Sequence, residues 1–296
     1  MGCRYPITEE NTMGMQINTN VSALNAYRNL ASTQNDLSKS LEKLSSGLRI
    51  NRAADDAAGL SISEGLRSQV SGLNVAARNA QDGISVIQTA EGALTEVHSI
   101  LQRMRDLAVQ GGNDSNNADS RTAIQTEADE LSKELARISA STSFNGISLM
   151  DGHSMTFQVG ANGDAAATDG NTISVKVADL SVLGDLKGAD AVTAGTGFKV
   201  TTNADAATTI EAIDTAITAI SSQRAGLGAA QNRFESTINS LNVSAENLSA
   251  AESRIRDTDM ASEMVKFTSK NILSQAGTAM LAQANQANQG VLQLLR

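Results

Sequence analysis

The sequence contains very few of the residues that interrupt helices or fill a thick apolar core. Its 296 residues include one proline, one cysteine and no tryptophan, and aromatic residues make up 2% of the chain. Because the only proline is Pro6, nothing downstream of it is forced to break a helix. Thin layers of long helices are therefore favoured over a deep globular interior with a substrate pocket.

Charge and hydropathy narrow the choice of partners. The net charge at pH 7 is −9, which gives no sign of the basic surface that nucleic-acid-binding proteins carry. No apolar run approaches the roughly 20 residues that a membrane-spanning helix needs. The single Cys3 cannot form a disulfide within the chain. We expect neither nucleic acid nor membrane as a partner.

Known catalytic motifs are missing as well. The chain has only His98 and His153, too far apart for a His-Glu-x-x-His zinc motif, and it contains neither a Walker loop nor a nucleophile elbow. His98 lies beside the apolar stripe of its predicted helix and needs no further role. Asp55 and Asp56 have no histidine or third carboxylate near them, so helix capping or ion pairing is favoured over catalysis. We predict no enzymatic activity, no cofactor and no metal.

The most regular pattern covers residues 210–255. Apolar residues there recur at alternating steps of three and four, the spacing that gives a helix one stripe for coiled-coil-like packing. At about 1.5 Å per residue the pattern predicts a rod of roughly 70 Å. We interpret the three polar members of the stripe as setting the packing register. The stripe consists of Ile210, Ile213, Ile217, Ile220, Arg224, Leu227, Gln231, Phe234, Ile238, Leu241, Ala245, Leu248, Glu252 and Ile255.

Two earlier segments carry stripes of the same period and can cover this rod. One reads Ile87, Ala90, Leu94, Val97, Leu101, Met104 and Ala108, and the other reads Ile124, Ala128, Leu131, Leu135 and Ile138. Between them, residues 111–117 read Gly-Gly-Asn-Asp-Ser-Asn-Asn, which favours a turn. Residues 84–138 are therefore predicted to form a helical hairpin that packs on the 210–255 helix.

Short strands are expected after the hairpin. Residues 144–152 contain an Asn-Gly and an Asp-Gly pair, both favourable turn sequences. Residues 155–159 and 172–177 alternate as strands do, so a small β-hairpin element is predicted. Residues 178–207 are rich in Ala, Gly, Thr and Asp and give little structural prediction.

A further heptad helix is predicted near the amino terminus. Its stripe reads Ala23, Tyr27, Leu30, Gln34, Leu37, Leu41, Leu44 and Leu48. Residues 44–63 follow as a connector in which Gly47 and Gly59 bracket a run of alanines, and these small side chains predict close packing. Residues 1–14 share none of this periodicity and lack the apolar stretch of a cleaved signal peptide, so we interpret them as an extension.

The last segment, residues 271–295, contains no charged residue. Its apolar members predict one side of a helix, and amides including Gln286 lie on the other. A monomer gains nothing by excluding charge from a solvated face, whereas a helix stacked beside identical copies avoids like-charge repulsion. We therefore predict contacts between copies along this segment. The assembly residues predicted within it are Met280, Ala284, Gln286, Ala287, Val291 and Leu295.

Long motifs at both ends resemble those of bacterial flagellins. Residues 15–26 read Met-Gln-Ile-Asn-Thr-Asn-Val-Ser-Ala-Leu-Asn-Ala, and the connector 44–63 resembles the amino-terminal signature of that family. Residues 253–263 read Ser-Arg-Ile-Arg-Asp-Thr-Asp-Met-Ala-Ser-Glu, and residues 275–286 read Gln-Ala-Gly-Thr-Ala-Met-Leu-Ala-Gln-Ala-Asn-Gln. The resemblance covers residues 15–165 and 208–296.

With this resemblance, the expected fold is mainly α: an elongated, heptad-patterned helical bundle with paired N- and C-terminal helices and a small β-hairpin element. The resemblance implies a structural subunit that self-assembles through its terminal helices into the bacterial flagellar filament, outside the cell, for swimming motility. It thereby adds Leu30, Leu37 and Leu41 of the amino-terminal helix to the predicted assembly residues. It further implies type III export without cleavage, an export chaperone on the carboxy-terminal segment, and contact with filament cap and junction proteins. The alternatives are a hook–filament junction protein and a soluble coiled-coil adaptor.

The resemblance also implies a domain organisation. Residues 1–14 are an extension outside the family, and residues 15–57 with 257–296 form the terminal-helix assembly domain. Residues 58–180 with 208–256 form a rod-like helical bundle that carries the β-hairpin. Residues 181–207 are expected to be a short remnant of the variable region.

One helix resembles a site recognised by the host. Residues 102–110 resemble the flagellin helix that a vertebrate Toll-like innate immune receptor recognises, with Arg103 and Leu107 at contact positions and Glu127 matching one on the neighbouring helix. Asp106 stands where this helix often has Glu, which shortens one polar contact. A solvated helix face is the alternative interpretation.

Overall fold

The computed structural model describes residues 20–163, 170–187 and 198–294. The chain divides into two compact units, Met1–Glu64 with Ala251–Arg296 (unit 1) and Gly65–Ala250 (unit 2). The expected extension at residues 1–14 lies outside the described residues. The finer domain limits expected from the sequence stay a prediction.

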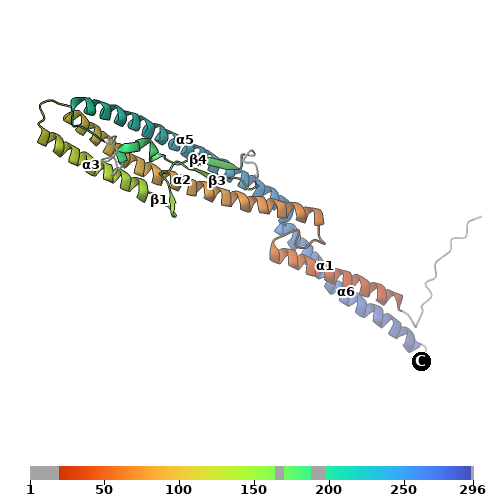
Figure 1. The fold of residues 1–296 in the computed structure, drawn as a ribbon. Coiled ribbons are helices and arrows are strands. Elements are labelled where there is room, and N and C mark those ends of the chain that lie inside the picture. The colour runs from red at the N-terminus through yellow and green to blue at the C-terminus, as the bar shows by residue number, and fades with distance from the viewer. Residues whose placement is uncertain (1–19, 164–169, 188–197, 295–296) are drawn as a thin grey trace, which may run out of the picture. The chain divides into compact units, whose positions relative to one another are not determined.

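Unit 2 is built on three helices that lie side by side in Figure 1: α2 (Ala57–Gly111), α3 (Ala118–Ser141) and α5 (Asn203–Arg256). The predicted hairpin is confirmed, because α2 and α3 are joined by a turn within 111–117, and the Asn117 side chain caps α3 by accepting a hydrogen bond from the Ser120 amide at 2.7 Å. Every member of the predicted stripe on α5 is buried or half-buried. The heptad pattern thus identified the core-facing side of each helix.

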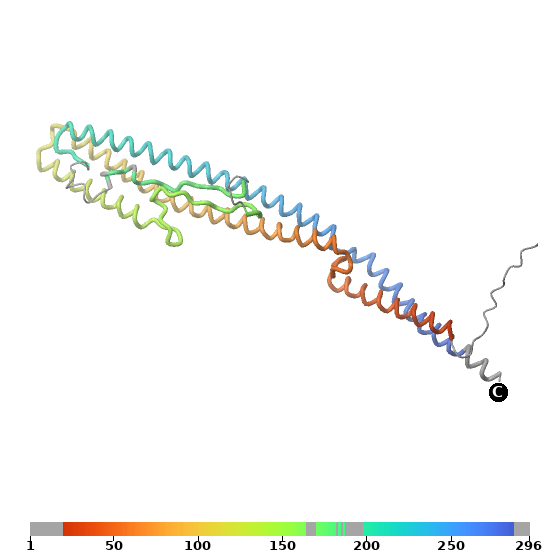
Figure 2. The backbone as a smooth tube through the Cα atoms, turned by 45° about the vertical axis from the view of Figure 1, so that its right-hand side comes forward, coloured from red at the N-terminus to blue at the C-terminus, as the bar shows by residue number. Residues whose placement is uncertain are grey.

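Two small antiparallel sheets complete unit 2, and Figure 2 shows the longer one running along the helices. Strands β1 (Ser143–Phe144) and β2 (Ile147–Ser148) are joined by Asn145 and Gly146, both at positive φ, as a two-residue hairpin turn requires. Strands β3 (Ser154–Gln158) and β4 (Thr172–Lys176) pair with Thr156 opposite Ser174. The predicted strands are confirmed to within one residue at each end.

Aromatic packing joins the longer sheet to α5. The ring of Phe157 on β3 meets Phe234 edge to face, with centroids 5.4 Å apart and planes at 89°. Gly83 of α2 lies against the same ring, because a Cβ built there would fall 2.9 Å from Phe234 Cζ. The small residue on α2 therefore makes room for one of the few aromatic rings in the chain.

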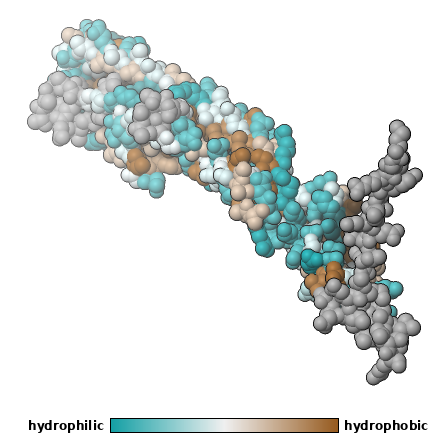
Figure 3. All heavy atoms as spheres, turned by 90° about the vertical axis from the view of Figure 1, so that its right-hand side faces the viewer, coloured by the Kyte–Doolittle hydropathy of each residue, from teal (hydrophilic) through white to brown (hydrophobic). Residues whose placement is uncertain are grey.

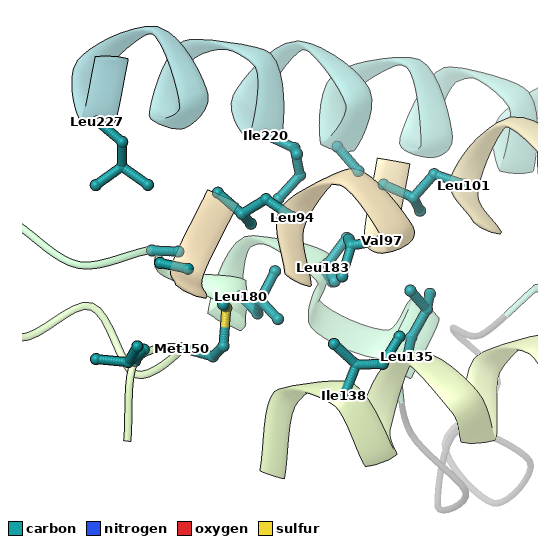
Figure 4. Packing of buried hydrophobic residues seen from close by; sticks show 14 of the residues in the cluster. Leu94, Val97, Leu101, Leu135, Ile138, Met150, Leu180, Leu183, Ile220 and Leu227 are labelled. Atoms are coloured by element: carbon teal, nitrogen blue, oxygen red, sulfur yellow. The ribbon is translucent and has the colours of Figure 1, made fainter. Parts of the chain in front are cut away.

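The segment after β4 contributes to the core, which the sequence did not predict. A 3-10 helix, η1 (Leu180–Lys187), packs on α3 and buries Leu180 and Leu183. Figure 4 shows these two side chains pointing into the space between α2 and α3. Gln223 of α5 holds the start of this segment, since its amide oxygen accepts from the Asp179 amide at 3.0 Å and its nitrogen donates to the Asp179 carbonyl at 2.9 Å.

Unit 1 contains α1 (Val21–Ser46) and α6 (Met260–Leu294), which pack along each other. Helix α1 ends at Gly47, whose φ of 73° gives the left-handed cap that glycine adopts at low cost. The predicted capping role is confirmed for Asp56, whose Oδ1 accepts from the Gly59 amide at 2.9 Å at the start of α2. Asp55 instead closes a turn of the connector, because its Oδ2 accepts from the Arg52 amide at 3.0 Å.

A short backbone bridge ties the two ends of unit 1 together. Leu48 pairs with Asp257 as an isolated antiparallel bridge. The Arg49 amide donates to the Arg256 carbonyl at 2.6 Å, and the Thr258 amide donates to the Gly47 carbonyl at 3.0 Å. The chain therefore enters α2 and leaves α5 at one fixed place.

Unit 1 has almost no interior of its own. Among its described residues, Ile50 is the only buried hydrophobic side chain, and the other buried side chains are polar or small. Unit 2, in contrast, buries one continuous cluster that draws on α2, α3, α5, η1 and the sheets. Apolar burial, the main source of folding stability, is therefore concentrated in unit 2.

We expect hydrogen exchange to separate the two units in the free subunit. Amides of α1 and α6 should exchange at least about tenfold faster than those at 87–108 of α2, because opening a helix pair without a core exposes little apolar surface. Mass-spectrometric exchange on the purified, unassembled chain measures this. Equal protection of both regions would contradict the assignment of stability to unit 2.

Candidate functional site

The candidate site is the pair of terminal helices, because this is where the predicted assembly residues gather. The side chains of α1 that are buried or half-buried include Ala23, Ala26, Leu30, Thr33, Leu37, Ser40 and Leu44. Those of α6 are Glu263, Phe267, Lys270, Ser274, Gly277, Leu281 and Ala284. Both sets step by alternating threes and fours, so each helix presents one heptad stripe to the other.

The stripe of α1 differs from the predicted one. The prediction paired Leu30 and Leu37 with Tyr27 and Leu41, but both Tyr27 and Leu41 are exposed. In the structure the alternate positions are occupied by Ala26, Thr33 and Ser40, one residue earlier in each heptad. Small side chains at these positions let α6 approach closely, and the larger apolar residues remain on the surface.

The two helices approach closely where Leu30 meets Gly277. A Cβ built on Gly277 would lie 3.1 Å from Leu30 Cδ1, tighter than ordinary van der Waals contact. Glycine in a helix interior costs roughly 0.5–1 kcal/mol relative to alanine. Here that cost is offset, because the absence of a side chain at Gly277 lets Leu30 pack against the α6 backbone.

Polar contacts fix the register of the two helices. The Asn20 side chain uses both ends: its oxygen caps α1 by accepting from the Ala23 amide at 2.9 Å, and its nitrogen donates to the Ala284 carbonyl at 2.9 Å. Lys270 Nζ donates to Asp36 Oδ2 at 2.8 Å, which lowers the pKa of that carboxyl. A slip of one turn would break both contacts.

Glu263 is the buried charge of this interface, with 5% of its surface exposed. Burial alone raises its pKa, but a hydrogen bond with the Ser40 side chain, a hydrogen bond from Lys266 and the nearby charge of Lys43 outweigh it. The pKa of Glu263 is therefore lowered below its ordinary value of 4.5. Lys266 Nζ lies 3.1 Å from Glu263 Oε2.

Both helices keep large apolar side chains on the surface after they have paired. Most of the exposed large hydrophobic residues of the described chain belong to unit 1, and on the face drawn in Figure 3 hydrophobic residues reach the surface. We call them the exposed apolar set: Val21, Leu24, Tyr27, Leu41, Ile62, Met260, Met264, Val265, Ile272, Leu273 and Met280. Part of it, from Met264 to Leu273, lines a shallow apolar groove along α6.

The predicted assembly residues fall into three groups. Leu30, Leu37 and Ala284 are half-buried between α1 and α6, so they hold the pair together. Leu41, Met280 and Gln286 are exposed, so they do not take part in the contact between α1 and α6. The side chains of Ala287 and Val291, and all of Leu295, lie outside the described residues.

The residues expected to contact a host receptor lie in unit 2. Arg103 of α2 pairs with Glu127 of α3 through Nε at 2.9 Å and Nη2 at 2.5 Å, and both side chains are about half exposed. Leu107 is 1% exposed and lies in the core. The surface available to a partner at this place therefore comes from the ion pair and from exposed Asp106 rather than from the leucine.

Several residues of the helix pair were not singled out by the sequence analysis, among them Asn20, Glu263 and Gly277. The three- and four-residue spacing from Glu263 to Ala284 would have identified the last two if polar residues and glycine had been counted as members of the stripe. Asn20 acts through a contact 264 residues away along the chain, for which no local signal exists.

The described residues contain neither a cluster of metal-binding side chains nor a membrane-spanning helix. No group of three or more His, Cys, Asp and Glu side chains among them is placed to hold a metal ion. None of their helices is long and apolar enough to cross a membrane. The chemistry of the candidate site is that of helix association.

We expect acid to weaken the pairing of α1 and α6 through Glu263. Its folded pKa is lowered, so the carboxylate stabilises the pair above about pH 4.5, and this contribution is lost as the pH falls through the folded pKa. Glu263→Gln should lower the free energy of unfolding of the helix pair at neutral pH by about 1–2 kcal/mol. The stability of the variant should also depend less on pH than that of the parent. Circular dichroism melting at a series of pH values measures both effects.

Glu246→Gln is the matched control for this experiment, because Glu246 is exposed on α5 and the substitution changes the net charge equally. It should leave the acid response unchanged. If Glu263→Gln and the parent lose stability over the same acid range, Glu263 is not the responsible group.

Comparison with known proteins covers both ends of the chain. Residues 17–155 match the bacterial flagellin N-terminal helical region, and residues 210–295 match the bacterial flagellin C-terminal helical region. A flagellin of Halalkalibacterium halodurans is 52% identical over 285 residues, which cover 95% of this chain and 100% of that protein. The flagellar filament 33 kDa core protein of Treponema phagedenis is 47% identical with the same coverage.

A solved structure of a flagellar hook-associated protein from Vibrio parahaemolyticus superposes with a TM-score of 0.57. It is 15% identical and covers 69% of this chain and 100% of that one, so the likeness is one of fold. The two matched helical regions span most of the sequence, and the relatives align over their entire length. The chain belongs to the bacterial flagellin family.

Proposed function

We propose that this chain is a structural subunit of the bacterial flagellar filament and that copies associate through the exposed apolar set of unit 1. The observation that carries the proposal is the imbalance within that unit: among its described residues one hydrophobic side chain is buried and a large set remains exposed. Large exposed apolar surfaces mark interaction sites in soluble proteins. Relatives named flagellin and filament core protein align along nearly the whole chain.

The lack of charged residues in the segment 271–295 supports many copies over one fixed partner. A helix surrounded by identical helices meets its own charges at short range, whereas an adaptor selects its partner with complementary charges. The exposed side of α6 in this region carries amides such as Gln283 and Gln286. Amides satisfy hydrogen bonds without repelling the same residue in a neighbour.

The two alternatives are not favoured. A hook–filament junction protein would resemble hook-associated proteins in sequence, but the likeness to the Vibrio protein is 15% identity and so concerns the fold. A soluble coiled-coil adaptor does not explain why whole-length relatives are flagellins. The role is structural rather than catalytic.

We further propose the surrounding steps that the family membership suggests. The assembly domain comprises residues 15–57 and 257–296, and residues 58–180 with 208–256 form the bundle, with 181–207 as a remnant of the variable region. The subunit is exported by the flagellar type III apparatus without cleavage and functions outside the cell. An export chaperone holds the carboxy-terminal segment, and cap and junction proteins contact the growing and basal ends of the filament.

A Toll-like receptor of a host is a further proposed partner. The surface offered to it comprises Arg103 and Glu127, held by their ion pair across α2 and α3. Leu107 contributes by filling the core beneath this surface, because its side chain is buried.

We expect the purified chain to form filaments visible by electron microscopy and the Gln286→Glu variant to need a higher concentration to do so. Like charges 4 Å apart repel by about 1 kcal/mol in water, and partial burial raises this several-fold. Added salt should partly restore assembly if the contact is wet, since screening acts over about 8 Å. Salt-insensitive failure would place Gln286 in a dry contact.

Gln88→Glu, the same change at an exposed position of α2 in unit 2, is the control and should assemble like the parent. If the parent forms no filaments under any condition tested, the proposed function is wrong. If Gln286→Glu and the parent assemble alike at low and high salt, the uncharged segment is not explained by close packing of copies.

For the receptor surface, we expect Arg103→Ala to weaken receptor activation about tenfold or more while helix content stays unchanged, because a truncated arginine loses both its charge and its contact area. Arg105→Ala is the matched control. Arg105 lies on the same helix but pairs with Asp214 of α5 at 2.6 Å. A cellular reporter of receptor activation measures both variants, and equal responses would remove Arg103 from the site.

A further inference from the structure

The described methionines divide into two classes by position. Met260, Met264 and Met280 all lie on α6, with 49%, 54% and 63% of their surface exposed. Met104 and Met150 lie in the core of unit 2 and are 0% and 2% exposed, and Met155 is half-buried on β3. The chain thus presents thioethers to solvent on one helix and shields them in the other unit.

The three exposed methionines avoid the contact between α6 and α1. The stripe that faces α1 runs through Glu263, Phe267, Gly277 and Leu281, and the exposed methionines occupy other positions around the helix. Met264 lines the shallow apolar groove of α6 together with Val265 and Ile272. A chemical change at these sulfurs therefore leaves the helix pair intact and alters only the surface that it presents.

An exposed thioether reacts with hydroperoxides. The sulfur lone pair attacks the distal oxygen of the peroxide, an S–O bond forms as the O–O bond breaks, and the peroxide is reduced to water or an alcohol while sulfur loses two electrons. The product, methionine sulfoxide, is polar where methionine is apolar, and it disrupts apolar interfaces. A buried methionine is shielded from the same reagent by its neighbours.

We propose that Met260, Met264 and Met280 form an oxidation-sensitive modification site, at which hydroperoxide converts the free subunit into an assembly-incompetent form without unfolding it. This inference rests on the proposed function, since the lost property is association of copies. Each sulfoxide places a polar group in the exposed apolar set, so burying that surface against another copy becomes less favourable. Enzymatic reduction of the sulfoxides restores the apolar surface and, with it, assembly.

The experiment treats the unassembled full-length chain with hydrogen peroxide and maps sulfoxide by peptide mass spectrometry. We expect oxidation at the three α6 methionines well before Met104 and Met150, which serve as internal controls. Circular dichroism should show unchanged helix content. The concentration needed for filament formation should rise about tenfold or more, as lost burial of several side chains implies.

Two further samples make the result decisive. A variant with Met260→Leu, Met264→Leu and Met280→Leu keeps the apolar volume, and the concentration that it needs for assembly, whatever its untreated value, should not change on peroxide treatment. The oxidised parent, treated with methionine sulfoxide reductases, should regain assembly, and this arm does not depend on the variant being assembly-competent.

The outcomes separate this inference from the proposed function. If the untreated parent does not assemble, the filament function fails, while the map of oxidised residues still tests the accessibility of the three sulfurs. If the oxidised parent assembles like the untreated one, or if peroxide abolishes assembly of the leucine variant too, the modification site is overturned. Oxidation of Met104 and Met150 as fast as the α6 methionines would also overturn it.

Discussion

Two helices packed side by side can each bury one stripe, and they leave the rest of their surfaces to solvent. That constraint governs unit 1, where α1 and α6 meet through small, polar and half-buried residues. Ile50, in the segment between α1 and α2, is the single buried hydrophobic side chain among the described residues of this unit. The large apolar residues of the pair stay exposed in the part of the chain that the structure describes. The proposed association with further copies would cover them, so folding and assembly of these helices would depend on the same surface.

In unit 2, by contrast, the apolar stripe of each helix is covered by other helices of the same chain, and this architecture could be predicted from the sequence. The stripe on α5 needs an apolar partner along its length, and α2 and α3 carry stripes of the same period. A turn of glycine and short polar residues determines where the hairpin bends. Even the polar interruption Arg224 fits its predicted role, since it reaches Glu91 of α2 at 3.7 Å and so favours one register of the two helices. The periodicity of apolar residues is therefore enough to predict the packing of helices whose stripes are covered by other helices of the same chain.

Periodicity was insufficient where contacts are set by close approach. It assigned Tyr27 and Leu41 to the buried stripe of α1, because it weighs apolar character and ignores which side chains let a second helix come near. Gly277 and Ser40 decide that question, and neither looks like a core residue. Leu180 and Leu183 of η1 are buried because they fill the space between α2 and α3, and the local sequence of η1 does not indicate that space. The same holds for Asn20, whose partner is distant in sequence.

The bridge between Leu48 and Asp257 has a consequence for the evolution of chain length. It closes residues 49–256 into one loop whose two ends are held by hydrogen bonds between backbone groups. The entropy lost on closing a flexible loop grows only with the logarithm of its length, so doubling it costs about 0.6 kcal/mol. Lengthening a flexible surface loop within this segment therefore costs little free energy and leaves these backbone hydrogen bonds in place. A chain built this way can gain or lose surface segments and still present the same two helices to its neighbours.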